Sequence, residues 1–264
     1  MRKKIMMLIC LLPLMGCDRA QRQGLPGTPV DLTHEFSSKT LYWPNADHFR
    51  LEKVFDGTTD KGYHYAANNF TAAEHGGTHM DAPVHFKAGG LTVDQLPIAR
   101  TTGAAVIVDV SEQALKQGDY EVKVADLQLF EAKHGPIGTD QIVLIATGYD
   151  RFWPDAATYL GTAERGSAGI AKLHFPGLSP QAADWLVEER QIRAVGIDTA
   201  SIDFGQSNRF ESHQIFAAAG VPIFENLKGL VGLKAERLTF IGLPMKIEGG
   251  SGAPLRAMAL LPVP

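Results

Sequence analysis

Two nearly uninterrupted apolar runs constrain the fold of this chain more strongly than any other feature: AAVIVDV at 104–110 and QIVLIAT at 141–147. A strand with one face in water alternates apolar and polar residues, whereas a strand buried on both faces is apolar throughout. A third run of this kind, IRAVGID, follows at 192–198. These runs therefore predict the central strands of a sheet that is covered on both sides.

Helices and further strands are predicted between and after these runs. SPQAADWLVEER at 179–190 predicts a helix, because Ser179 is a suitable N-cap. SHQIFAAAG at 212–220 predicts another, with Ser212 as its cap and Gly220 at its end. Further strands are expected at 30–36, 221–227, 236–244 and 254–262.

The segment 30–264 is expected to form one domain. The whole chain has 264 residues, a length that suits one large domain, and its apolar content of 45% suits a soluble protein with a full core. Strands alternating with helices predict the α/β class, and adjacent strands predict a mixed sheet. The formal net charge of −4, without a basic stripe or tail, argues against nucleic-acid binding.

The N-terminus is expected to be a targeting signal. Three basic residues and a short apolar run open the chain, which is typical of a secretory signal peptide over residues 1–16. The end of this run, LMGC at 14–17, resembles the lipobox of bacterial lipoproteins, which implies that Cys17 carries lipid. The alternative is an ordinary signal peptide with a chance cysteine. Residues 17–29 are then a flexible tether, and the lipid is the only expected membrane contact.

This prediction places the protein on the periplasmic side of a bacterial membrane, and Asp18 resembles the signal that retains such proteins at the inner membrane. It also decides the cysteine chemistry. Cys10 leaves with the signal and Cys17 carries lipid, so neither a disulfide nor a thiolate nucleophile is expected in the mature domain. Loss of three basic residues with the signal changes the net charge from −4 to −7.

The stretch EHGGTHMDAPVHF at 74–86 gathers three histidines and an aspartate. His75 and His79 are four apart, as in helical zinc sites, but a helix is disfavoured because each glycine would cost about 1 kcal/mol and the proline about 3 kcal/mol. A straight strand would separate the same two residues by roughly 13 Å. We therefore predict a turn at the two glycines, after which His79 and Asp81 point to the same side of an extended chain.

Neutral imidazoles beside a carboxylate predict a metal site of mixed nitrogen and oxygen ligands, suited to Zn, Mn or Fe. Three protein ligands with open positions are typical of a catalytic metal rather than a structural one. The alternative is a set of surface or hydrogen-bonded histidines in a glycine-rich loop. That alternative would hold for one histidine, but it fits a cluster of this density poorly.

The same residues carry a resemblance to a known family. The pattern H-x-G-T-H-x-D-x-P-x-H, here from His75 to His85, is similar without departure to the signature of the cyclase family, which includes bacterial kynurenine formamidases and isatin hydrolases. A second family element is a histidine followed twelve residues later by a glutamate, here His213 and Glu225. The segments DLTHEF, YWP and GIDTASID resemble further family segments. The wider context resembles the isatin hydrolases more than the compact formamidases.

The resemblance implies an α/β domain with a mixed, barrel-like β-sheet flanked by helices, assembled as a homodimer or a higher homo-oligomer. It also implies that His75, His79 and Asp81 are ligands of one divalent metal, Mn or Zn. His213 and Glu225 then either help to hold a second ion, which Asp81 bridges, or lie beside the substrate or behind the ligands.

His85 is implied to lie near the metal and is the candidate general base, with His213 as a second catalytic candidate. A divalent ion lowers the pKa of bound water and polarises an amide carbonyl, so that His85 could take the proton of the water and return it to the leaving nitrogen. The predicted activity is hydrolysis of the C–N bond of an aryl formamide or a cyclic aryl amide. Trp43 and Trp153 are candidates for the wall of an aromatic substrate pocket.

Two other interpretations remain open. One is a metal-binding lipoprotein without catalysis, which would need the ligands but neither His85 nor a substrate pocket. The other is dehydration or cyclisation chemistry at the same site. His34 is expected to be structural, and the glycine-rich GGSGAP at 249–254 is expected to be a plain turn or a loop near the site.

Overall fold

The computed structural model describes residues 27–233 and 237–262. The strands are β1 (Thr28–Asp31), β2 (Arg50–Thr58), β3 (His64–Thr71), β4 (His79–Asp81), β5 (Thr102–Asp109), β6 (Glu121–Val122), β7 (Ile142–Ala146), β8 (Gly177–Leu178), β9 (Ala194–Ile197), β10 (Ile223–Glu225), β11 (Arg237–Pro244) and β12 (Gly252–Leu261). The α-helices are α1 (Ser111–Ala114), α2 (Val124–His134), α3 (Ala156–Tyr159), α4 (Gly166–Ile170), α5 (Pro180–Glu188) and α6 (Glu211–Ala218).

The predicted signal peptide and Cys17 lie outside the described residues. β1 begins at Thr28, which is inside the predicted tether. None of the helices in the described part of the chain is both long and apolar enough to span a bilayer.

The main sheet closes on itself. Its strand order is β1-β12-β11-β5-β7-β9-β10-β4, and β4 pairs with β12 as well as with β10. The strands β5, β7, β9 and β10 run parallel to their neighbours in this group, whereas the remaining pairs are antiparallel. The prediction of a single α/β domain with a mixed, barrel-like sheet is therefore confirmed.

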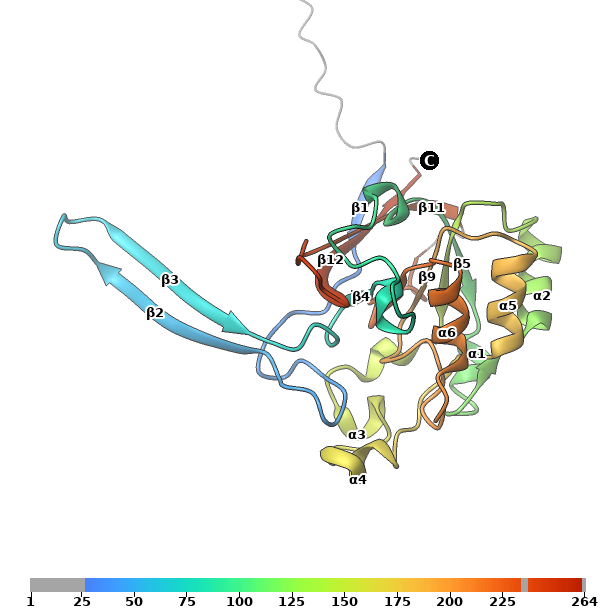
Figure 1. Cartoon of the computed structure of the whole chain (residues 1–264), viewed down its shortest axis with the longest axis horizontal. Helices are drawn as coiled ribbons and strands as arrows, with labels where there is room; N and C mark the ends of the chain where they lie inside the picture. The colour runs from blue at the N-terminus through green and yellow to red at the C-terminus, as the bar shows by residue number, and fades with distance from the viewer. Residues whose placement is uncertain (1–26, 234–236, 263–264) are drawn as a thin grey trace, which may run out of the picture.

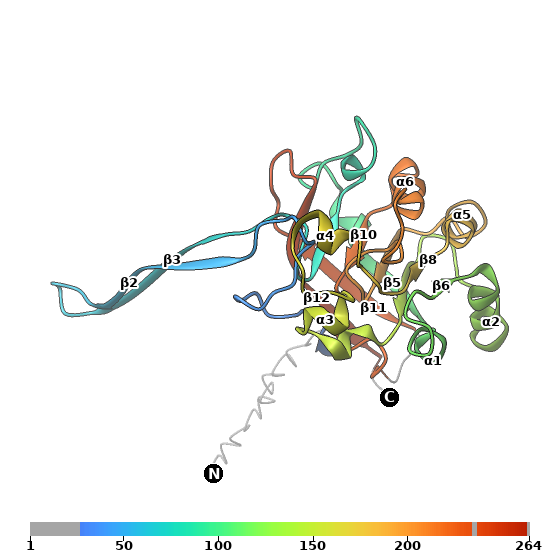
Figure 2. The same ribbon diagram turned by 90° about the horizontal axis from the view of Figure 1, so that it is seen from below.

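The central apolar runs are buried on both faces, as predicted. In β5, Val106 and Val108 belong to a core between the sheet and the helices, while Ala105 and Ile107 belong to the core enclosed by the sheet. The strand β7 divides its side chains between the two cores in the same way. The helices α2, α5 and α6 lie along one side of the barrel (Figures 1 and 2). Alternating side chains thus explain why these strands are apolar throughout.

The predicted helix at 179–190 is observed as α5. Ser179 caps it, because its hydroxyl oxygen accepts a hydrogen bond from the amide of Ala182. The helix predicted at 212–220 is α6, which ends before Gly220, whose φ is +70°.

The cap predicted for α6 is wrong. Ser212 lies inside the helix, and its hydroxyl donates to the carbonyl of Leu178. The carboxylate of Asp203 instead accepts hydrogen bonds from the amides of Ser212 and His213. A residue from the preceding loop therefore satisfies the free amides at the start of this helix, which sequence neighbours alone did not reveal.

The strand predicted at 30–36 is too long. β1 ends at Asp31, whose carboxylate accepts a hydrogen bond from the amide of Thr33, and this local turn takes the chain away from β12. Beyond it, Thr33 forms only an isolated bridge with Leu227.

The strands β2 and β3 form a two-stranded hairpin that was not predicted, and we call residues 50–71 the arm. The arm extends away from the barrel in both ribbon views (Figures 1 and 2). None of its residues is buried. The arm therefore stands apart from the two cores that hold the rest of the chain.

Candidate metal centre

The histidine cluster is built on a turn that only glycine accommodates easily. Gly77 has a φ of +58°, and a Cβ there would lie 2.7 Å from the ring of Phe36. After this turn, β4 is extended and lies between β10 and β12. His79 and Asp81 point to the same side, with Nε2 of the histidine 3.2 Å from Oδ1 of the carboxylate. The predicted turn and the predicted convergence are both observed.

His75 lies before the turn and reaches the same carboxylate. Its Nδ1 is 2.7 Å from Oδ1 of Asp81, and its Nε2 is 2.8 Å from the hydroxyl of Ser251. That hydroxyl donates to Oε2 of Glu74 at 2.7 Å. Ser251 belongs to the glycine-rich segment 249–254, so this segment is a loop of the site rather than a plain turn.

The helix α6 and the strand β10 bring a second pair of groups to Asp81. Nε2 of His213 lies 3.2 Å from Oδ2 of Asp81 and 3.2 Å from Oε1 of Glu225. The other oxygen of Glu225 is 3.5 Å from Nε2 of His79. These four groups are almost completely buried. Side chains far apart in the sequence therefore converge on the carboxylate of Asp81.

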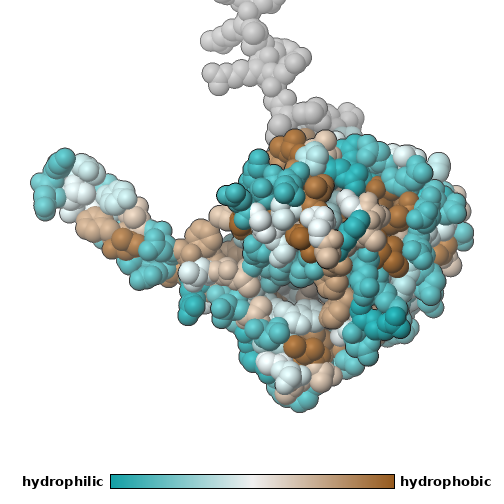
Figure 3. Space-filling view, viewed as in Figure 1, coloured by the Kyte–Doolittle hydropathy of each residue, from teal (hydrophilic) through white to brown (hydrophobic). Residues whose placement is uncertain are grey.

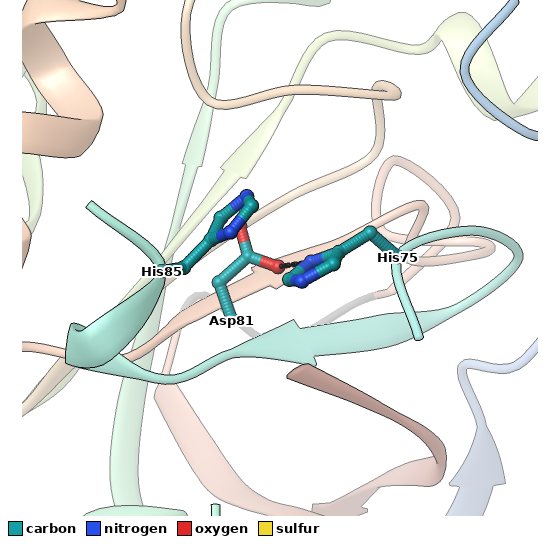
Figure 4. A group of neighbouring side chains, drawn as sticks. All are labelled: His75, Asp81 and His85. Atoms are coloured by element: carbon teal, nitrogen blue, oxygen red, sulfur yellow. Dashed lines mark hydrogen bonds and ion pairs between the residues drawn. The ribbon is translucent and has the colours of Figure 1, made fainter. Parts of the chain in front are cut away.

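His85 completes the cluster from a short 3₁₀-helix, η1 (Pro83–His85). Its ring stacks on that of His75 with the centroids 3.8 Å apart. Figure 4 shows the carboxylate of Asp81 beside both rings. The possible ligand atoms of His75, Asp81 and His85 lie within 4.8 Å of one another, and so do those of His79, Asp81 and Glu225. The two groups share Asp81.

The second ring nitrogens of His79 and His213 have partners that suit this cluster to a metal ion. Nδ1 of His79 lies 2.9 Å from the carbonyl oxygen of Gly77, and Nδ1 of His213 lies 2.6 Å from Oδ2 of Asp203. Each of these oxygen acceptors favours a ring proton on Nδ1, so that in the neutral imidazole Nε2 is free to act as a ligand atom. Histidines that bind metals are held by this kind of partner.

The acidic surroundings also raise the affinity of the buried histidines for protons. Burial by itself would lower the pKa of His79 and of His213. Asp81 and Glu225 outweigh burial and raise the pKa of His79, while Asp203, Asp81 and Glu225 raise the pKa of His213 well above its usual value.

The pKa values of the two carboxylates of the cluster are shifted in opposite directions. Burial opposes ionisation of Asp81, but the charge of His75 and the hydrogen bonds from the histidines hold its pKa well below the usual value. Burial, followed by the nearby charge of Asp81, raises the pKa of Glu225. Within the described residues, no lysine or arginine forms an ion pair with either carboxylate. Positive charge is therefore strongly favoured between them, whether it comes from protons or from a cation.

His85 differs from the other histidines of the cluster. Burial by the surrounding atoms lowers the pKa of its imidazole to about 4. The side chain remains exposed to the solvent of the cavity, so water moderates this shift. With a pKa below that of free histidine, His85 is neutral at pH 7 and can accept a proton.

A cavity of about 320 Å³ opens directly onto the cluster. Its apolar wall includes Trp43, Phe86, Phe210 and Leu160. All four histidines of the cluster also line it. The hydroxyl of Tyr42 is buried here and has no hydrogen-bond partner among the described residues. The site thus combines a polar floor with an aromatic wall.

The structure separates the two tryptophans that were predicted to bind substrate. Trp43 lines the cavity, whereas Trp153 is not among the lining residues. The ring of Trp153 stacks on His34 at a centroid distance of 4.2 Å and contacts Tyr159 edge-on. His34 is buried at this position, as expected for a structural residue.

Several residues of the site had no predicted role, namely Asp203, Ser251, Glu74, Asn226 and Phe210. Asp203 lies in the segment GIDTASID, which carried the family resemblance and was the one available signal for it. Asn226 donates to the carbonyl oxygen of Gly77 and accepts a hydrogen bond from the hydroxyl of Tyr159. Such partners depend on tertiary contacts and leave no short motif.

The closed mixed sheet and the buried histidine–carboxylate cluster define the class to which the chain belongs. The sequence model of the cyclase family matches residues 30–204. This match covers more than half of the chain, and the protein is therefore a member of the cyclase family.

Named relatives are found over almost the whole domain. An isatin hydrolase of Roseibium aggregatum is 29% identical over 247 residues, which cover 90% of this chain and 88% of the relative. A kynurenine formamidase of Salinibacter ruber is 26% identical over 236 residues, which cover 87% of this chain and 95% of the relative. The solved structure of isatin hydrolase A from Ralstonia solanacearum superimposes with a TM-score of 0.79 at 32% identity, covering 89% of this chain and 92% of that one.

Proposed function

We propose that this protein hydrolyses the C–N bond of a small aryl amide with the help of a divalent metal ion, Mn or Zn. The observation that carries the proposal is the buried cluster around Asp81, which opens into an aromatic cavity with the neutral His85 at its edge. The similarity to isatin hydrolases, at 29% and 32% identity, favours a cyclic aryl amide over an N-formyl arylamine.

The ligands of the ion would come from His75, His79, Asp81, His213 and Glu225. Their donor set of imidazole nitrogens and carboxylate oxygens suits Mn or Zn. When bound, such an ion acidifies a water molecule and polarises the carbonyl of the substrate.

The protein's own groups supply the remaining steps. His85, which is neutral at pH 7, accepts the proton of the attacking water and returns it to the leaving nitrogen. Burial raises the pKa of Tyr42 to about 12, so its hydroxyl stays protonated and can donate a hydrogen bond to a polar atom of the substrate. The rings of Trp43, Phe86 and Phe210 exclude water and hold an aromatic ring.

The test begins with the purified chain, stripped of metal by a chelator and reloaded with Mn or Zn. The ultraviolet absorbance of isatin and of N-formylkynurenine is then followed separately. Metal-dependent ring opening of isatin is the expected result, and loss of the formyl group alone would assign the formamidase activity instead. If neither compound changed with either metal, the hydrolase proposal would fail.

The variant His85→Ala separates this enzyme from a metal-binding protein without catalysis. We expect kcat to fall by about 10²-fold or more, because a general base is lost, while the amount of bound metal stays unchanged. His64→Ala is the control, since this histidine is exposed on the arm. Equal turnover in the two variants would exclude His85 as the base. Loss of metal in His85→Ala would make it a ligand.

We also infer that the protein is exported and anchored through lipid on Cys17, on the periplasmic side of the inner membrane. The support is the basic start, the short apolar run and the LMGC sequence at 14–17. Mass spectrometry of the mature N-terminus tests this inference. A lipid-modified Cys17 is expected, and an intact N-terminal methionine would exclude processing.

A further inference from the structure

One wall of the cavity is a short turn, residues 43–46, which we call the wall turn. All its residues except Pro44 line the cavity. On its upstream side, Tyr42 forms an isolated bridge with the glycine-rich turn of the metal centre. Within the wall turn, the amide of Ala46 donates to the carbonyl oxygen of Trp43 at 2.9 Å. The wall turn is therefore joined to the metal centre at one end, and its remaining carbonyl oxygens need donors from elsewhere in the chain.

Two consecutive residues at the start of α4 supply these donors. The guanidinium of Arg165 donates through Nη1 to the carbonyl oxygen of Trp43 at 3.2 Å, and through Nη2 to that of Ala46. The amide of Gly166 donates to the carbonyl oxygen of Pro44 at 2.9 Å. Three of the four carbonyl oxygens of the wall turn are thus bound by one surface segment.

The helix α4 also packs closely against the wall turn. A Cβ at Gly169 would lie 3.1 Å from Cβ of Pro44 and 2.1 Å from the carbonyl oxygen of Glu164, so only glycine permits this approach. Both ribbon views place α4 beside the chain that leads into β2 (Figures 1 and 2). The space-filling view shows the surface hollowed between the barrel and the part of the molecule that contains α3 and α4 (Figure 3). The position of α4 therefore affects one side of the cavity.

The wall turn determines where the ring of Trp43 lies. This ring contacts Phe175 and Phe210 edge-on, with the centroids 6.2 Å and 6.1 Å apart. The ring of Phe210 in turn lies 5.7 Å from that of Phe86 and 6.2 Å from that of His213. The aromatic wall is therefore continuous from the wall turn to the metal centre, and a shift of the turn changes the space between them.

Arginine is the side chain best suited to hold such a turn. Its planar guanidinium carries several N–H groups and can donate to two carbonyl oxygens at once, whereas lysine offers a single ammonium group. Hydrogen bonds from a charged donor are also stronger than those between neutral groups. The arginine ion pairs within the described residues are formed by Arg190, Arg193, Arg209 and Arg256, and Arg165 is not among them. Its guanidinium therefore serves the two carbonyl oxygens and not a carboxylate.

We propose that Arg165 is a positioning residue: by holding the wall turn, it places Trp43 against the aryl ring of the substrate. This inference rests on the proposed function, because an aryl amide is the ligand that this wall would bind. Arg165 is not among the residues that line the cavity, so it acts through the turn and touches no reacting atom. Its loss therefore weakens binding of the substrate and of the transition state equally, which raises KM and leaves kcat nearly unchanged.

The first experiment compares the kinetics of isatin hydrolysis by the Mn-loaded wild type and the variant Arg165→Ala. We expect KM to rise about tenfold while kcat stays within about twofold of the wild type. Arg237→Ala is the matched control, because Nη2 of this arginine donates to the carbonyl oxygens of residues 134–136, which lie outside the cavity lining. KM should be unchanged in the control. An unchanged KM in Arg165→Ala, or an equal rise in the control, would overturn the proposal.

Hydrogen exchange followed by mass spectrometry tests the same assignment without any turnover. In Arg165→Ala, peptides that contain the wall turn or Gly166 should exchange faster than in the wild type, while those of β7 remain protected, which shows that the barrel is folded. In Arg237→Ala, exchange of the wall turn should equal that of the wild type. Unchanged exchange of the wall turn in Arg165→Ala would overturn the proposal. If the wild type does not hydrolyse isatin, the proposed function fails, and exchange alone decides whether Arg165 holds the wall turn.

Discussion

The metal centre and the arm depart from the usual distribution of residues in opposite ways. In the centre, His79, Asp81, His213 and Glu225 are buried although they can carry charge. On the arm, apolar side chains such as Phe55 are exposed although they would gain from burial. Each departure indicates a partner that the folded chain does not itself provide. For the centre we propose a divalent cation, whereas the apolar side chains of the arm lack a covering surface within the described residues.

The largest effect is expected where the centre loses its shared carboxylate. Asp81→Asn should weaken binding of Mn or Zn by more than about 100-fold. Loss of a residue that only hydrogen-bonds to a metal ligand already lowers affinity by up to that amount, and Asp81 is proposed to be a ligand itself. Isothermal titration of the chelator-treated chain measures this. Asp184→Asn on the exposed face of α5 is the control. Unchanged affinity in Asp81→Asn would remove this residue from the ligand set.

The pH dependence of metal binding tests whether protons and cations compete at the centre. The raised pKa values of His79 and His213 mean that both histidines hold a proton more tightly than free histidine does when no cation is bound. A cation must displace these protons, so its affinity should rise with pH, by up to about 100-fold per pH unit if two protons leave. Competition titrations between pH 6 and pH 8 measure the slope. A slope of zero would show that neither histidine binds the ion.

A smaller loss of metal affinity is expected when a residue that hydrogen-bonds to a ligand histidine is replaced. In Asp203→Asn, the side-chain amide can donate to Nδ1 of His213 and so place the ring proton on Nε2, which should lower metal affinity by about 10–100-fold. Ser251→Ala removes only a neutral partner of His75 and should cost less than about tenfold. The two dissociation constants are compared directly, and the reverse order would contradict this account of the ring protons.

Substitution of two glycines with left-handed backbone conformation compares how tightly the two regions are packed. Gly77 at the centre has a φ of +58° and Gly62 at the tip of the arm has a φ of +81°. Gly77→Ala should lower the free energy of unfolding by about 2–5 kcal/mol, because the strained backbone and the clash with Phe36 add. Gly62→Ala should cost only about 1 kcal/mol, since a methyl group there meets no atom within 4 Å. Urea unfolding measures both, and equal losses would contradict the difference in packing.

Local sequence patterns were sufficient to predict the strands that are buried on both faces. The runs at 104–110 and 141–147 became β5 and β7 because strands covered on both faces need apolar residues at every position. The turn at Gly77 was also predictable, since no other arrangement brings the spaced ligands together. The arm was not predicted, because its exposed strands leave no continuous apolar run to recognise.

The sequence by itself determined the α/β class, the histidine–aspartate cluster and the family, since these depend on residues that are close in the chain. Only the tertiary structure decided that His213 and Glu225 face Asp81, that Asp203 holds His213, and that Trp153 packs on His34 away from the cavity. The reason is physical: a side chain's chemistry is local, but its hydrogen-bond partners and its burial depend on closing the sheet, which brings distant residues together.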